Sequence, residues 1–290
     1  MSASLHFAAM KTRSLRLLLF LFGVGIVLNG CAVLQPPSAT GPRALNDLYP
    51  ILFTENTDRK EATLAALHRL EQSSNTNGTE PQLQPVTGTI ISLPNTSGAL
   101  YLPKLGTGAT MSEEETRESL RRFIREWQQL IGADPVKLSL VERIDQPDGL
   151  KIAKYEQRPF RYPIRGIYGK LQITFTADRR VVNLTSTCIP DADQMQTALS
   201  ALTLRPKAED ALQQIRQSGL EYTNAQGTKT KWTVPPSSDI TVRGLTIYFV
   251  PAENHPDTLE MHLTWEMEFS NAPIKLAYVD AVSGKVIAVE

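Results

Sequence analysis

The sequence is poor in cysteine and histidine and carries no net charge. Of its 290 residues two are cysteine and four are histidine, and 30 Lys and Arg balance 30 Asp and Glu. Two cysteines cannot build a disulfide scaffold or a four-thiolate zinc site. The lack of a basic excess argues against a nucleic-acid partner. With 41% hydrophobic residues the chain can still form a core, and its length suits two domains.

Motifs for catalysis and cofactor binding are missing as well. The sequence has no His-Glu-X-X-His, no Gly-X-Ser-X-Gly and no phosphate-binding loop, and Gly106-X-Gly108 lacks the third glycine of a nucleotide fingerprint. Cys188 would need a histidine partner to act as a nucleophile, and we expect instead a half-buried structural thiol at a strand end. The sequence therefore predicts no enzyme, no metal and no cofactor.

The first thirty residues hold the one long apolar run. Lys11, Arg13 and Arg16 precede Leu17 to Leu28, a run without charged or polar side chains. Twelve helical residues span about 18 Å, too short for a hydrocarbon core of about 30 Å. A basic start followed by a short apolar run is typical of a secretory signal peptide.

The residues after this run resemble a lipobox. Leu28-Asn29-Gly30-Cys31 is similar to the motif at which bacterial lipoproteins are cleaved and lipidated. The resemblance implies a signal peptide over 1–30 and a thioether-linked diacylglycerol plus an N-acyl chain on Cys31, enough for stable membrane anchoring. Ala32 after the cysteine implies the outer membrane if the cell is Gram-negative. The alternative is an uncleaved anchor helix with an incidental cysteine.

We interpret residues 31–110 as a tether with some secondary structure. Its proline-rich start favours a linker. Apolar spacing predicts a helix over 57–72, and two short apolar runs, 89–93 and 99–102, predict strands.

The strongest helix signal begins at Ser112, which can form a capping box with Glu115. Six apolar residues then fall on one helical face, and Gly132 is suited to a left-handed end. They are Leu120, Phe123, Ile124, Trp127, Leu130 and Ile131. Four β-rich runs with short turns follow and favour an antiparallel sheet: 136–144, 150–157, 167–176 and 181–187. Residues 111–191 are therefore predicted as a helix packed on a sheet.

A second unit over 192–290 repeats this order. Apolar spacing predicts a helix from Ala208 to Ile215. Strands are predicted at 245–250, 259–269, 274–279 and 285–289. The predicted fold class is thus α+β, with two consecutive helix-on-antiparallel-sheet units after a signal peptide and a tether.

Alternation along 259–269 predicts one apolar and one solvated face. His262 falls on the solvated face with Glu260, Thr264 and Glu266. A Glu-His-Glu metal site is geometrically conceivable there, and a solvated sheet face is the simpler alternative. An enzyme with an unfamiliar site at His262 or Cys188 is a further alternative.

The two units resemble a known pairing. Residues 111–191 resemble the fungalysin/thermolysin propeptide motif, and 192–290 resemble a PepSY domain, which is cystatin-like; together they form the propeptide of thermolysin-type secreted metalloproteases. The residues that carry the resemblance are the helix around Phe123 and Trp127, Tyr155-Glu156-Gln157, Tyr162-Pro163-Ile164-Arg165-Gly166, Leu263-Thr264-Trp265-Glu266-Met267 and Asp280-Ala281-Val282-Ser283-Gly284. Because no protease motif follows before Glu290, we expect a propeptide module that acts apart from its enzyme.

This resemblance implies a non-enzymatic, lipid-anchored envelope protein that binds a protein partner. Its most specific form is inhibition or folding assistance, in trans, of a secreted metalloprotease. Gln157, Tyr162, Pro163 and Gly166 are candidate partner-binding residues, with the shaping of a turn as the simpler alternative. An exposed sheet edge is another route to a partner strand. The rival hypothesis is a structural or ligand-binding lipoprotein that uses the fold as a scaffold.

Overall fold

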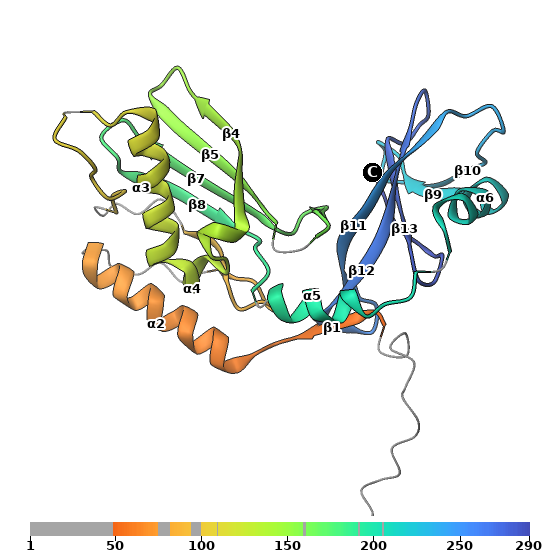
Figure 1. Cartoon of the computed structure of the whole chain (residues 1–290), viewed down its shortest axis with the longest axis horizontal. Helices are drawn as coiled ribbons and strands as arrows, with labels where there is room; N and C mark the ends of the chain where they lie inside the picture. Colours follow the sequence, from red (N-terminus) through yellow and green to blue (C-terminus); the bar gives the residue numbers. More distant parts are fainter. Residues whose placement is uncertain are drawn as a thin grey trace, which may run out of the picture. The chain divides into compact units, whose positions relative to one another are not determined.

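The computed structural model describes residues 49–74, 82–93, 100–108, 110–158, 161–190, 192–204 and 206–290. They form two six-stranded sheets and one two-stranded sheet, with helices packed beside them (Figure 1). The predicted α+β class is confirmed. The predicted signal peptide and Cys31 lie outside the described residues. Within the described ranges, no helix is both long and apolar enough to cross a membrane.

The first sheet is antiparallel throughout, in the order β2-β3-β8-β7-β5-β4. Its strands are β2 (Gln82–Leu83), β3 (Ile90–Leu93), β4 (Leu138–Asp145), β5 (Leu150–Gln157), β7 (Lys170–Thr176) and β8 (Val181–Ser186). The four predicted runs after the helix are confirmed as β4, β5, β7 and β8. Of the strand predicted at 99–102, the described residues 100–102 contain one isolated bridge, between Tyr101 and Arg180.

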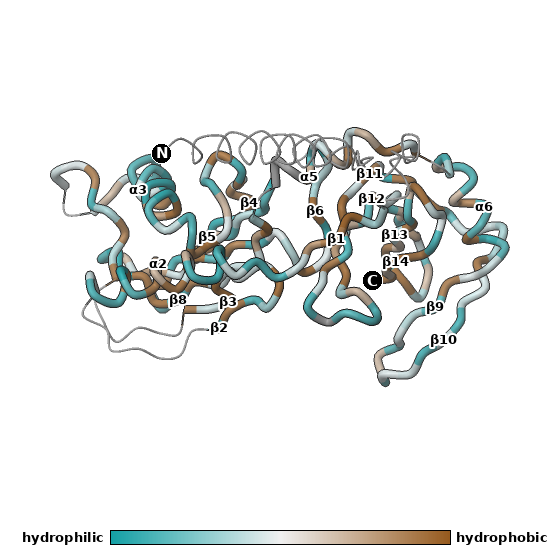
Figure 2. The backbone as a smooth tube through the Cα atoms, turned by 90° about the horizontal axis from the view of Figure 1, so that it is seen from below, coloured by the Kyte–Doolittle hydropathy of each residue, from teal (hydrophilic) through white to brown (hydrophobic). Residues whose placement is uncertain are grey.

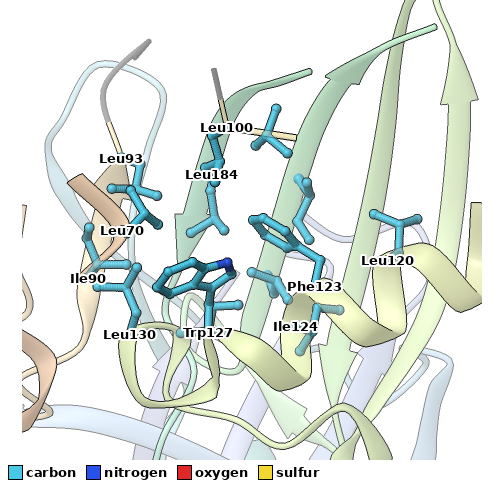
Figure 3. Packing of buried hydrophobic residues seen from close by; sticks show 14 of the residues in the cluster. Leu70, Ile90, Leu93, Leu100, Leu120, Phe123, Ile124, Trp127, Leu130 and Leu184 are labelled. Carbon is cyan, nitrogen blue, oxygen red and sulfur yellow. The ribbon is translucent and has the colours of Figure 1, made fainter. Parts of the chain in front are cut away.

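Helix α3 (Glu113–Glu126) and the short α4 (Gln128–Ile131) supply the apolar face that packs on this sheet. The capping box is confirmed: Ser112 Oγ accepts from the Glu115 N–H at 3.2 Å, and Glu115 accepts from the Ser112 N–H at 2.7 Å. Gly132 ends α4 with φ +85°. All six predicted apolar residues are buried, and Figure 3 shows several of them packed with Leu70 and Ile90.

Leu70 comes from α2 (Thr57–Ser74), which confirms the helix predicted at 57–72. The same helix changes the interpretation of residues 31–110 as a tether. With Ala66 and Leu67, Leu70 belongs to the same core as α3. β2 and β3 also join the first sheet. The described part of the predicted tether is therefore built into the fold.

The second sheet follows the order β14-β13-β12-β11-β6, and β1 also pairs with β12. Its strands are β1 (Ile51–Thr54), β6 (Ile164–Arg165), β11 (Ile240–Ala252), β12 (His255–Phe269), β13 (Leu276–Asp280) and β14 (Val286–Val289). Hydrophobic and hydrophilic residues both occur along the strands of this sheet (Figure 2). The four predicted strands of the second unit are confirmed as β11 to β14.

Two helices and a hairpin complete this half of the chain. The predicted helix is confirmed as α6 (Ala208–Ser218). A further helix, α5 (Ala192–Ser200), and the hairpin of β9 (Leu220–Thr223) and β10 (Lys229–Trp232) were not predicted. Met195 and Leu199 of α5 are buried in a cluster with strands β11 and β12.

Two pairings differ from a simple helix-then-sheet order. β6 lies between β5 and β7 in sequence, yet it pairs with β11 of the second sheet, in parallel. β1 precedes α2, yet it pairs antiparallel with β12. Both strands are too short for sequence periodicity to reveal them, and both take their hydrogen-bonding partners from distant parts of the chain.

Candidate functional site

The segment 162–166, predicted as a partner-binding stretch, binds the chain's own second sheet. The Ile247 N–H donates to the Pro163 carbonyl at 2.8 Å. Gly166 has φ +75°, and a Cβ at that position would lie 2.9 Å from the Tyr248 ring. Glycine is therefore needed both for the backbone conformation and for the close approach.

Gln157 is also engaged internally. It is 2% exposed, and its amide donates to the Ile189 carbonyl at 2.6 Å and accepts from the Ile189 N–H at 2.7 Å. Tyr162 is partly buried against the apolar cluster that contains Ile189. Direct contact between Gln157 and a partner is incompatible with this burial, so the amide joins the end of β5 to the segment after β8.

An ion pair between a buried carboxylate and a partly exposed arginine ties β6 to β12. The Glu266 side chain is 1% exposed, and the Arg165 Nε donates to its carboxylate at 2.6 Å. Arg243 of β11 approaches the same carboxylate at 3.5 Å and pairs with Glu268 at 2.7 Å. A carboxylate at this depth is stable only with such partners.

Replacing Arg165 with Met is expected to lower the free energy of unfolding by about 3 kcal/mol, because it leaves Glu266 buried with only the more distant Arg243. The control is Lys154→Met, which breaks a pair with Glu142 between side chains 40% and 51% exposed. That change is expected to cost less than about 1 kcal/mol. Urea denaturation measures both, and equal losses would contradict the assignment.

His262 lies in a buried polar cluster, and the predicted solvated face is wrong. His262, Thr264 and Glu266 are 6%, 0% and 1% exposed. Polar side chains on this face cover one another, because they meet partners from β6, β11 and β13. The apolar face of the same strand is buried too, so alternation did not distinguish a solvated face from a paired one.

Both ring nitrogens of His262 face carboxylates. Nδ1 lies 2.7 Å from Asp280 Oδ2, and Nε2 lies 3.1 Å from Glu260 Oε2. The Tyr49 hydroxyl donates to the same Asp280 oxygen at 2.6 Å and accepts from the Leu263 N–H at 2.9 Å. Among the residues that the structure describes, no group of three or more metal-ligating side chains is found.

Asp280 is the centre of this cluster. Its other carboxylate oxygen accepts from the backbone N–H groups of Val282 and Ser283 at 2.9 and 2.6 Å. Burial alone would raise the pKa of Asp280, but the hydrogen bonds from His262, Tyr49 and the two backbone groups outweigh it and hold the pKa below its ordinary value of 3.8. Burial and the Asp280 charge raise the pKa of Tyr49, which keeps its hydroxyl a donor.

Asp280 should make the free energy of unfolding depend on pH in the acidic range. Because its pKa is lowered on folding, the stabilisation is complete above the ordinary value and is lost as pH falls through the folded-state pKa. Asp280→Asn is therefore expected to be less stable than wild type at pH 5, with the difference narrowing below about pH 4. Thermal denaturation across this range tests it, and a pH-independent difference would refute it.

Cys188 is fully buried rather than half-buried as expected. Its exposure is 0%, and its backbone N–H donates to Ser186 Oγ at 3.2 Å. Burial raises the pKa of its thiol to about 12, so the nucleophilic thiolate is scarce at neutral pH.

One open cavity lies along β1. A cavity of about 680 Å³ is lined by the continuous run 51–59 and by Met195 and Ala198 of α5. β1 pairs with β12 on one side, and no second strand among the described residues pairs with its other side. No sequence pattern indicates this site beyond the general expectation of an exposed sheet edge, because four residues carry too little periodicity.

Comparisons with known proteins leave the family open. No family model matches the chain, and no curated protein matches it. Among solved structures, it is similar to the Bacillus megaterium YpeB C-terminal domain, with 10% sequence identity and a TM-score of 0.29. The match covers 82% of this chain and 98% of that one. At this level of similarity, no activity is transferred.

Proposed function

We propose that this is a non-enzymatic, lipid-anchored protein of the cell envelope that binds a protein partner. The observation that supports binding is the outer edge of β1, which no other strand in the described part of the chain pairs with and which lies beside a cavity of about 680 Å³. An unpaired strand edge is a common docking site for an extended segment of another protein.

The state of the reactive side chains supports a role without catalysis. A general base needs a ring nitrogen that can reach a substrate, and His262 has both nitrogens against carboxylates. A cysteine nucleophile needs an accessible thiolate, and Cys188 is buried with a raised pKa. The candidate residues for a reaction are thus occupied in holding the fold.

Membrane attachment through Cys31 rests on the sequence. The basic start, the apolar run and the lipobox resemblance support it, and Ala32 favours the outer membrane if the cell is Gram-negative. Cys31→Ser is expected to abolish incorporation of labelled palmitate and to move the protein out of the membrane fraction. A variant that still incorporates palmitate would contradict lipidation at this residue.

A secreted thermolysin-type metalloprotease is the partner that the sequence resemblance favours, through inhibition or folding assistance in trans. The full chain in mild detergent is expected to form a complex with such a protease and to slow its cleavage of a peptide substrate, or to raise the yield when the denatured protease refolds. Chromatography and the two activity assays measure these effects. If complex formation and both effects are absent, this partner assignment is wrong.

A further inference from the structure

Two carboxylates around His262 have one cation between them. The side chains of Asp280 and Glu260 are 0% and 28% exposed, and they lie 2.7 Å and 3.1 Å from the two ring nitrogens. Within the described ranges of the chain, neither carboxylate forms a salt bridge with a lysine or an arginine. The charge state of the imidazole therefore decides how these two anions are balanced.

The hydrogen bonds to Asp280 assign a proton to Nδ1 of the ring. This carboxylate also accepts from the Tyr49 hydroxyl and from the backbone N–H groups of Val282 and Ser283. These bonds hold the pKa of Asp280 below its ordinary value, so the carboxylate is ionised at neutral pH and can only accept. The ring of His262 must then donate through Nδ1 in both of its charge states.

Nε2 is therefore the position at which the ring gains or loses a proton. A neutral imidazole has one N–H, so a bare Nε2 faces the Glu260 carboxylate as a second acceptor at 3.1 Å. A protonated ring donates from both nitrogens, and Nε2 then forms a charge-assisted hydrogen bond with Glu260. Imidazole is the side chain that ordinarily changes charge between pH 5 and 8. The contact is thus attractive when the ring is charged and repulsive when it is neutral.

The other titratable groups around the ring keep one charge state through this range. Tyr248 of β11 lies opposite His262 in the register, and its hydroxyl donates to Glu290 at 3.1 Å. The Tyr49 ring meets the imidazole edge-on, with centroids 5.8 Å apart, and its hydroxyl donates to Asp280. Burial raises the pKa of both phenols, to about 12 for Tyr248, so neither ionises below pH 8.

We infer that His262 and Glu260 form a pH-sensitive switch on β12. While Nε2 carries a proton the two side chains are an ion pair, and when that proton passes to water the carboxylate turns into solvent. Glu260 can turn outward because it is 28% exposed and its cross-strand neighbour on β1, Leu52, is uncharged and 60% exposed. Tyr49 and Asp280 stay bonded in both states, because Nδ1 keeps its proton. The switch does not depend on the partner proposed above.

The test compares Glu260→Gln with wild type at about pH 5 and about pH 9, on either side of the ordinary range of imidazole. A glutamine amide can accept from a protonated Nε2 and donate to a bare one. In urea denaturation of the full chain in mild detergent, the variant is expected to have a midpoint about 0.3 M lower at about pH 5, where the ion pair is lost. At about pH 9 its midpoint is expected to equal or exceed that of wild type. The same difference at both pH values would overturn the switch.

Two control variants separate the switch from a general effect of pH. Glu142→Gln removes a carboxylate that pairs with Lys154, a side chain charged at both pH values. Tyr49→Phe removes the hydroxyl that is bonded to Asp280. Each control is expected to differ from wild type by the same amount at both pH values. A control that changes with pH as Glu260→Gln does would overturn the assignment.

Nitrogen NMR of the imidazole observes the proton itself. His6, His68 and His255 are replaced with glutamine so that His262 alone gives ring signals; His68 and His255 are exposed. Nδ1 is expected to carry a proton at both pH values, and Nε2 only at the lower one. An Nε2 in the same state at both, or a bare Nδ1, would overturn the inference. This measurement decides the matter even if Glu260→Gln does not fold.

Discussion

The buried carboxylate of Glu266 sets the main constraint on this fold. It lies on the central strand β12 with 1% exposure, where an unpaired charge would cost several kcal/mol. Its closest partner, Arg165, comes from β6, in the loop between two strands of the first sheet. Pairing the charge therefore requires that loop to dock on the second sheet, so a segment between two strands of the first sheet contributes a strand to the second.

The hydrogen-bonded cluster around Asp280 and His262 constrains the position of β1 in a comparable way. Asp280 holds the Tyr49 hydroxyl, which also accepts the Leu263 N–H between the stretches of β12 that pair with β1 and β13. This fixes Tyr49 next to β12 and brings the following residues into register with it. The position of β1 is thus set by buried groups that already have hydrogen-bonding partners.

Sequence patterns predicted those parts of the fold whose signals are local. The capping box at Ser112 and the apolar spacing up to Gly132 depend on neighbours within a few residues, and the structure confirms them. β1 and β6 depend on hydrogen-bonding partners far along the chain. With four and two residues, respectively, they are too short to show an alternation of apolar and polar residues. Around His262, alternation separated two faces correctly, but polar residues that pair with one another can be buried as deeply as apolar ones.

The identity of Leu52 is harder to explain by folding than by contact. Its side chain is 60% exposed and makes no contribution to the clusters that bury Ile51 and Phe53, so a lysine there would protect the edge without loss to the core. The charged residues on β4 show that this chain protects another edge in that way. An uncharged edge beside a cavity increases the risk of aggregation, and a strand from a partner that covers it removes that risk. The partner strand that we propose for this edge would account for an exposed leucine at position 52.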